Sequence, residues 1–194
     1  MINTEKTTVN NFSNVPLFPY KIIEYLIYNG SEDLWKLLKY QSVDALSRPI
    51  LTPKEKVKLI WNGKDTQEQD YNIFLKPLVI NSMDTSLEQC QIRLYRYDTT
   101  PENRYRAIII YELDIITNEK SAIVTYQGLP CERTDLIETE LLNSLNDCDI
   151  HGMGNLIFDR ELSRTCKSLI GISNSKSFYG RSLFIGQRLQ NNGV

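Results

Sequence analysis

Three charged residues on or close to one apolar stretch are the strongest candidates for catalysis: Glu112, Asp114 and Lys120. Two carboxylates followed by a lysine are typical of metal-dependent nucleases, in which the carboxylates hold a divalent cation. Those enzymes place the lysine two residues after the second acid on the same strand, whereas Lys120 falls in a polar stretch that predicts a turn. The spacing therefore favours a structural interpretation, in which both acids lie on the outward face of an amphipathic strand.

A second candidate is a zinc site built on Cys148-x-x-His151, which Cys131 and Cys166 could complete if the fold brought them together. The cysteines form no CxxC pair, and their irregular spacing is that of small buried side chains. A chain of this size also folds without disulfides. We therefore expect reduced thiols and neither a metal nor another cofactor.

Nucleophilic catalysis and phosphate binding find little support in the sequence. His151 is the only histidine, and no Gly-x-Ser-x-Gly setting accompanies it. The motif Gly152-Met153-Gly154 lacks the further glycines and the lysine of a phosphate-binding loop. We therefore expect no catalytic and no cofactor-binding residue in this chain.

Basic residues gather in the C-terminal third, where Phe178 and Tyr179 are interleaved with them, and such a surface could contact nucleic acid. The whole chain has 24 acidic and 22 basic residues, so it lacks the overall positive field that drives nucleic-acid binding. Charged outer strand faces are also common, which makes nucleic-acid contact the weaker interpretation. The basic residues are Arg160, Arg164, Lys167, Lys176, Arg181 and Arg188.

Length and composition bound the class of protein. With 194 residues, of which 41% are apolar, the chain can bury one main core. No run of about 18 apolar residues occurs, and the first residues are polar where a signal peptide would be apolar. We therefore expect a soluble protein that is not secreted and does not contact a membrane.

The elements that must position Glu112 and Asp114 centre on residues 106–117, whose alternate residues from Ala107 to Ile115 form an unbroken apolar face. Residues 134–147 predict the amphipathic helix that covers this face, because leucine and isoleucine gather on one side of it. Each such side chain contributes roughly 1.5–3 kcal/mol when fully buried, which outweighs local propensity.

Further alternating or apolar stretches predict more strands around the central one. Residues 87–98, which precede the central strand, are expected to pair with it as an antiparallel hairpin. A polar turn is predicted at residues 171–177. The fold class is therefore α+β, an antiparallel sheet of about four to five strands with one packed amphipathic helix, in a core domain of residues 85–194. The further strands are predicted at residues 87–98, 122–126, 155–166 and 178–189.

Residues 16–84 predict a cluster of short helices and a connection, after a flexible N-terminal arm of residues 1–15. A first helix stops at Asn29-Gly30, and Ser31 caps a second one. The third starts at Thr52-Pro53-Lys54-Glu55, a capping box with proline at the first helical position, and ends at Asn62-Gly63. Helices this short are unstable alone and must dock on the core.

The order of these elements resembles the tail-completion proteins of tailed bacteriophages, a group that includes tail-terminator and head-tail joining proteins. The segments that carry the resemblance are IIIYELDIIT, RTDLIETELLNSL, GNLIFDREL and SFYGRSLFIGQRL, together with KIIEYLIYNGSEDLWKLLKY near the N-terminus. The chain departs from the family where a tryptophan often follows the central strand, since it has Ile115-Ile116-Thr117 there. The matching positions are Glu112, Asp114, Arg133, Phe178, Tyr179 and Gly180.

The resemblance implies a structural ring subunit of the virion neck, hexameric or dodecameric, assembled in the host cytoplasm. Its partners would be further copies of itself, the portal or adaptor protein, and tail or neck proteins. DNA would pass through the lumen without specific binding, which a neutral-to-acidic chain permits. Two alternatives stay open: a metal-dependent nuclease-like enzyme using Glu112 and Asp114, and a cytoplasmic adaptor module.

Overall fold

The strand β3 (Arg106–Asn118) is the centre of the fold, as its alternating sequence predicts. The side chains of Ala107, Ile109, Tyr111, Leu113 and Ile115 are all buried on one face. It pairs antiparallel along its length with β2 (Gln91–Asn103) and with β9 (Lys176–Gln190). The computed structural model describes residues 12, 14–64, 70–77, 89–103, 106–151, 153–165, 169–173 and 176–190.

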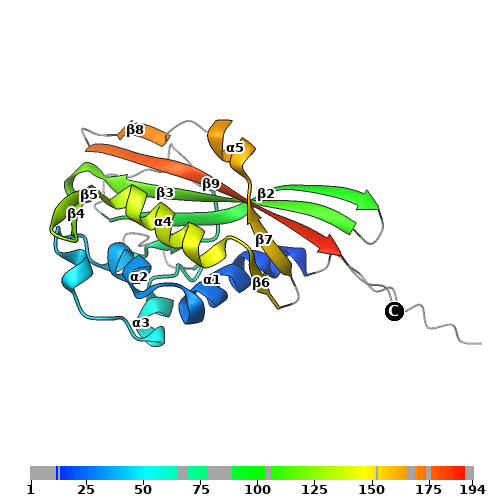
Figure 1. Cartoon of the computed structure of the whole chain (residues 1–194), viewed down its shortest axis with the longest axis horizontal. Coiled ribbons are helices and arrows are strands. Elements are labelled where there is room, and N and C mark those ends of the chain that lie inside the picture. The colour runs from blue at the N-terminus through cyan, green and yellow to red at the C-terminus, as the bar shows by residue number, and fades with distance from the viewer. Residues whose placement is uncertain are drawn as a thin grey trace, which may run out of the picture.

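These three strands belong to a seven-stranded, curled sheet (Figure 1). All pairings in it are antiparallel except that of β1 with β2. The strand order is β1 (Ile73–Phe74), β2, β3, β9, β7 (Gly154–Phe158) and β6 (Cys148–Ile150), with β8 (Leu169–Ser173) also paired to β9.

A separate hairpin of β4 (Ile123–Tyr126) and β5 (Leu129–Glu132) stands beside this sheet. Its two turn residues, Gln127 and Gly128, have φ angles of 51° and 82°. Positive φ at both central residues is the geometry of the type I′ turn, which matches the twist of two-residue hairpins. The hairpin therefore follows from local turn chemistry that the sequence analysis did not identify.

Helices cover one face of the sheet (Figure 1). Ser31 accepts a hydrogen bond from the backbone of Leu34, and Thr52 with Glu55 forms the predicted capping box. The buried residues of the first, second and fourth helices join the inner face of the sheet in one hydrophobic cluster. The helices are α1 (Phe18–Asn29), α2 (Glu32–Lys39), α3 (Pro53–Lys58), α4 (Arg133–Leu145) and α5 (Arg160–Thr165), with 3-10 turns at Val15–Leu17, Ala45–Ser47 and Glu119–Ser121.

The α+β class, the antiparallel sheet and the helix after residue 132 are confirmed, but the predicted number of strands was too small. The predicted strand 155–166 ends at Phe158, and α5 follows, because the backbone N–H of Asp159 bonds to Phe184 and Ser163 bonds back to Asp159. The predicted turn 171–177 was wrong at both ends, since β8 extends to Ser173 and pairs there with β9, which starts at Lys176. Short apolar runs fit a helix or a strand equally well, so long-range pairing decides.

Other boundaries differ in smaller ways. The third helix ends at Lys58 instead of Asn62, and the helix before β6 ends at Leu145, before Asp147 with its φ of 59°. Most of the predicted arm, residues 1–15, lies outside the described residues. The division at residues 84 and 85 stays a prediction. No helix within the described ranges is long and apolar enough to cross a membrane.

Arg133, the first residue of α4, fastens the helical layer to the rest of the fold. Its side chain is fully buried. The guanidinium donates to the carbonyl oxygen of Ser121 at 2.5 Å, just after β3. It also donates to three carbonyl oxygens at and after the end of α2: Leu37 at 2.5 Å, Tyr40 at 2.8 Å and Ser42 at 3.0 Å.

We expect Arg133→Met to lower the free energy of unfolding by roughly 3–5 kcal/mol, because two buried and two partly buried carbonyl oxygens lose a charged hydrogen-bond donor. Arg133→Lys should recover part of this loss, since an ammonium keeps the charge but cannot reach all four oxygens. Urea denaturation measures both. The exposed Arg106→Met is the control and should change stability by less than about 0.5 kcal/mol.

Candidate functional site

The structure brings Glu112 and Asp114 together on the outer face of β3, the face opposite the helices. In the strand register Glu112 lies between Tyr95 and Phe184, and Asp114 lies between Arg93 and Ser182. Asp114 is only 4% exposed. The two acids are therefore neighbours within the sheet, as their spacing predicts.

Neutral hydroxyl groups hold the carboxylate of Asp114. The Tyr95 hydroxyl donates to one oxygen at 3.1 Å, and the Ser182 hydroxyl donates to the other at 2.5 Å. Arg93 lies in the same cross-strand row, but its guanidinium stacks over the Phe74 ring at 4.4 Å and donates to the Gln91 side chain at 3.1 Å. Asp114 thus ties β2, β3 and β9 together through hydrogen bonds.

Glu112 has a less favourable environment than Asp114. Burial raises the pKa of its carboxyl group above the usual value, and the charge of Asp114 raises it further. Burial, followed by the charge of Asp114, also raises the pKa of the Tyr95 hydroxyl, so this group is a neutral donor at physiological pH. Glu112 therefore has the raised pKa that functional carboxylates often show.

The rest of the predicted nuclease set does not join this pair. Lys120 belongs to the 3-10 turn Glu119–Ser121 beyond Asn118, the last residue of β3, which is itself about 13 Å along the strand from Asp114. Within the described ranges no three His, Cys, Asp or Glu side chains lie together as a metal site would need. The geometry shows that Asp114 joins neighbouring strands, that Glu112 lies beside it, and that Lys120 is remote from both acids.

The cysteines of the hypothetical zinc site are separated. Cys131 is on β5 and Cys148 on β6, at opposite ends of the 13-residue helix α4, which spans about 20 Å. Cys166 lies outside the described residues. His151 is exposed, and its backbone carbonyl oxygen accepts a hydrogen bond from the Lys21 ammonium at 3.4 Å. Burial raises the pKa of the Cys90 thiol to about 12, which keeps it unreactive.

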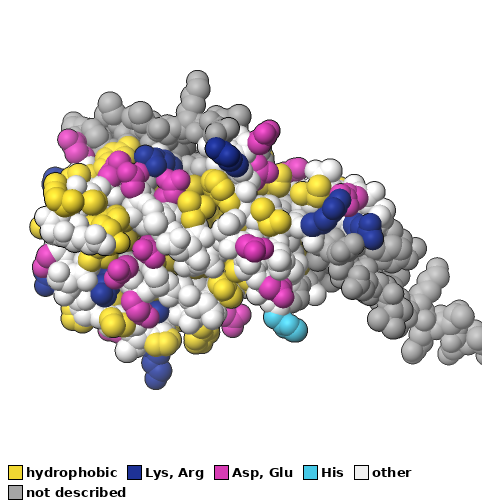
Figure 2. All heavy atoms as spheres, in the orientation of Figure 1, with side chains coloured by type: hydrophobic (Ala, Val, Ile, Leu, Met, Phe, Trp, Pro, Cys, Tyr) yellow, Lys and Arg dark blue, Asp and Glu magenta, His cyan; other side chains and the backbone are white. Residues whose placement is uncertain are grey.

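Two of the basic residues considered for nucleic-acid contact are engaged in ion pairs. Arg181 contacts both Asp135 and Glu138 on α4 at 2.8 Å. Arg188 contacts Glu102 at 2.6 Å. The described part of the structure does not include Lys167 or the side chains of Arg164, Lys176 and Phe178. On the face shown in Figure 2, acidic side chains are prominent over α4.

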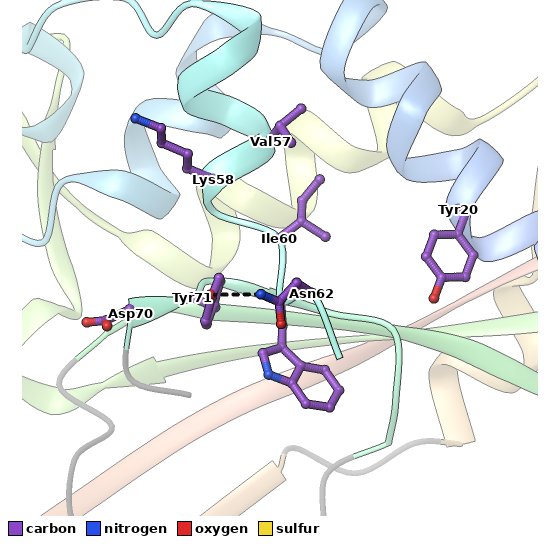
Figure 3. Close-up of a pocket in the computed structure, with 8 residues that line it drawn as sticks. Tyr20, Val57, Lys58, Ile60, Asn62, Asp70 and Tyr71 are labelled. Atoms are coloured by element: carbon purple, nitrogen blue, oxygen red, sulfur yellow. Dashed lines mark hydrogen bonds between the residues drawn. The ribbon is translucent and has the colours of Figure 1, made fainter. Parts of the chain in front are cut away.

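A groove that the sequence analysis did not identify lies between α1, α3 and the β1 edge of the sheet. It has a volume of about 570 Å³. Figure 3 shows Tyr20 and Asp70 at its two ends, with Val57 and Ile60 between them. No local signal could have found it, because its walls come from three separate segments. They comprise Tyr20, Val57, Lys58, Ile60, Trp61, Asn62, Asp70 and Tyr71.

The polar groups of this groove do not form a catalytic pair. Asn62 donates its side-chain amide to the Tyr71 hydroxyl at 3.5 Å, and the Lys76 ammonium lies 4.0 Å from the centre of the Trp61 ring. Apolar and aromatic side chains make up most of the surface. The groove is therefore suited to accept an apolar side chain rather than to carry out a reaction.

The fold and the matching family model together give the class of protein: an α+β chain of a family derived from a Bacillus phage. The chain belongs to the YomW family, whose model matches residues 31–185 and so covers the helical layer from α2 onward and most of the sheet. No curated protein matches the chain.

We expect Glu112→Gln to raise the melting temperature near pH 7.5. A carboxyl group whose pKa is raised by folding stabilises the fold while protonated, and this contribution is lost as the pH rises through the folded-state pKa. The advantage of the variant should therefore shrink as the pH falls toward 4. Thermal melts across this range measure it, with the exposed Glu24→Gln as control. An equal effect at both pH values would contradict the assignment.

Proposed function

We propose that the protein is a structural subunit of a tailed-phage virion neck, a head-tail joining or tail-completion ring protein between the portal or adaptor and the tail. Membership of a phage-derived family supports a role in a phage. In this proposal the chain assembles in the host cytoplasm, DNA passes through the lumen without specific binding, and the protein is not an enzyme.

The main support for the proposal is the role in the fold of the residues that match the tail-completion family. Arg133 is buried and donates to four backbone carbonyl oxygens, and Asp114 accepts hydrogen bonds from side chains of the two neighbouring strands. A side chain at Gly180 would overlap the carbonyl oxygen of Ile115, so only glycine lets β9 approach β3 there. These residues hold neighbouring strands and helices together. A subunit of a load-bearing assembly needs such internal stability.

A protein inventory of purified virions tests the proposal. We expect the chain in intact particles at six or twelve copies for each portal, the stoichiometry of a neck ring. Deleting its gene should leave filled heads and free tails, visible by electron microscopy. Complementation with Asp114→Asn should restore joined particles, whereas Arg133→Met should restore few or none, because its lower stability reduces the amount of folded subunit. Absence of the chain from intact virions would refute the role and favour the cytoplasmic adaptor alternative.

The nuclease alternative predicts a different result for the same acid pair. We expect purified protein to leave plasmid and linear DNA intact with Mg²⁺ or Mn²⁺, because Lys120 is remote from the acid pair and both oxygens of Asp114 accept hydrogen bonds, from Tyr95 and Ser182. Gel electrophoresis after prolonged incubation measures this. Metal-dependent cleavage that disappears in Asp114→Asn would establish the enzyme instead.

A further inference from the structure

We propose that copies of this chain associate head to tail, with the β6–β7 edge of one copy docked in the groove between α1 and α3 of the next. This inference rests on the proposed function for its biological setting. It assigns the two surfaces through which neighbouring copies contact each other. The surfaces are opposite in charge, and they border the first strand and the last two strands in the sheet order.

The first surface, here named the acidic edge, consists of Asp147, Asp149, Asn155 and Ile157. Asp149 is opposite Asn155 in the strand register, and the Asn155 amide donates to Asp147 at 3.4 Å. Ile157 follows Asn155 on the same side of β7 and is 60% exposed. Among the described residues no cation pairs with either aspartate. The exposed apolar side chain of Ile157 thus lies beside two carboxylates that form no ion pair within the described residues.

The second surface, here named the lysine groove, is the pocket of Figure 3 together with the exposed Lys54. Lys54 and Lys58 are four residues apart on α3, so both lie on one side of the helix. Val57 and Ile60 line the groove next to Lys58. Two carboxylates also lie nearby: Glu55 is bound to Thr52 in the capping box, and Asp70 is at the far end of the groove.

Both charge pairs are compact. Residues four apart on a helix have Cβ atoms about 5–6 Å apart. Asp147 and Asp149 also lie close together, because Asn155 is opposite Asp149 in the strand register and donates to Asp147. Lys54 and Lys58 can therefore face Asp149 and Asp147 together while Ile157 enters the groove. Exposed ion pairs add little energy, so burial of Ile157 provides affinity and the charges provide orientation.

The position of the surfaces makes the contact heterologous. The groove borders β1, the first strand in the sheet order, and the acidic edge is formed by β7 and β6, the last two. A contact between two different surfaces leaves one of each kind free after every addition. Such a contact repeats until it closes a ring or extends as a filament.

Charge reversal of each surface tests the contact. One variant carries Lys54→Glu with Lys58→Glu, and the other carries Asp147→Asn with Asp149→Lys, since asparagine tolerates the positive φ of residue 147. Mass photometry and sedimentation velocity at low salt should show each variant as a monomer at concentrations where the natural chain assembles. The equimolar mixture should assemble again, because opposite charges then face each other.

The controls are Arg106→Glu and Glu119→Lys, exposed charges outside both surfaces, which should assemble like the natural chain. Circular dichroism and melting temperature verify that every variant is folded. Assembly should weaken at 0.5 M salt. Unchanged assembly in either reversed variant, or a natural chain that stays monomeric at low salt, would overturn the assigned contact. The virion inventory decides the neck role separately, since a neck subunit can join through other surfaces.

Discussion

The buried guanidinium of Arg133 is the interaction on which the arrangement of layers depends. Removing this charge from water is costly, and only a close fit of donors to acceptors offsets the cost. The planar fork of arginine suits this position because it reaches carbonyl oxygens on two sides at once. One side is the chain leaving β3, and the other is the chain leaving α2. Arg133 thereby fixes where α4, α2 and the β4–β5 hairpin meet.

Two other buried polar side chains, Asn72 and Lys56, connect the helices to one another and to the sheet. Asn72 donates to the carbonyl oxygens of Leu38 on α2 and Cys90 before β2, both at 2.8 Å. Lys56 on α3 donates to Ile27 at 3.2 Å and to Glu32 at 2.9 Å. Apolar burial supplies most of the driving force, while these directional bonds select one arrangement of helices on the sheet.

The acid pair on the outer face shows the same use of polar groups for cohesion. Asp114 joins β2 to β9 through β3, so its carboxylate is part of the sheet rather than a group exposed for chemistry. Glu112, one pleat away, lies in a partly desolvated position that raises its pKa. The outer face is therefore held together by an arrangement that is sensitive to protonation at a single carboxyl group.

The sequence by itself determined the central strand, the helix that covers it and the caps of the short helices, because alternation, periodicity and capping are local signals. It also placed Glu112 beside Asp114, since residues two apart on a strand share a face. Only the tertiary structure decided the end of the strand at Phe158, the pairing of β8, the partners of Arg133 and the groove beside α3. These depend on contacts between segments far apart in the chain, and no local pattern encodes which distant carbonyl group or side chain will be there.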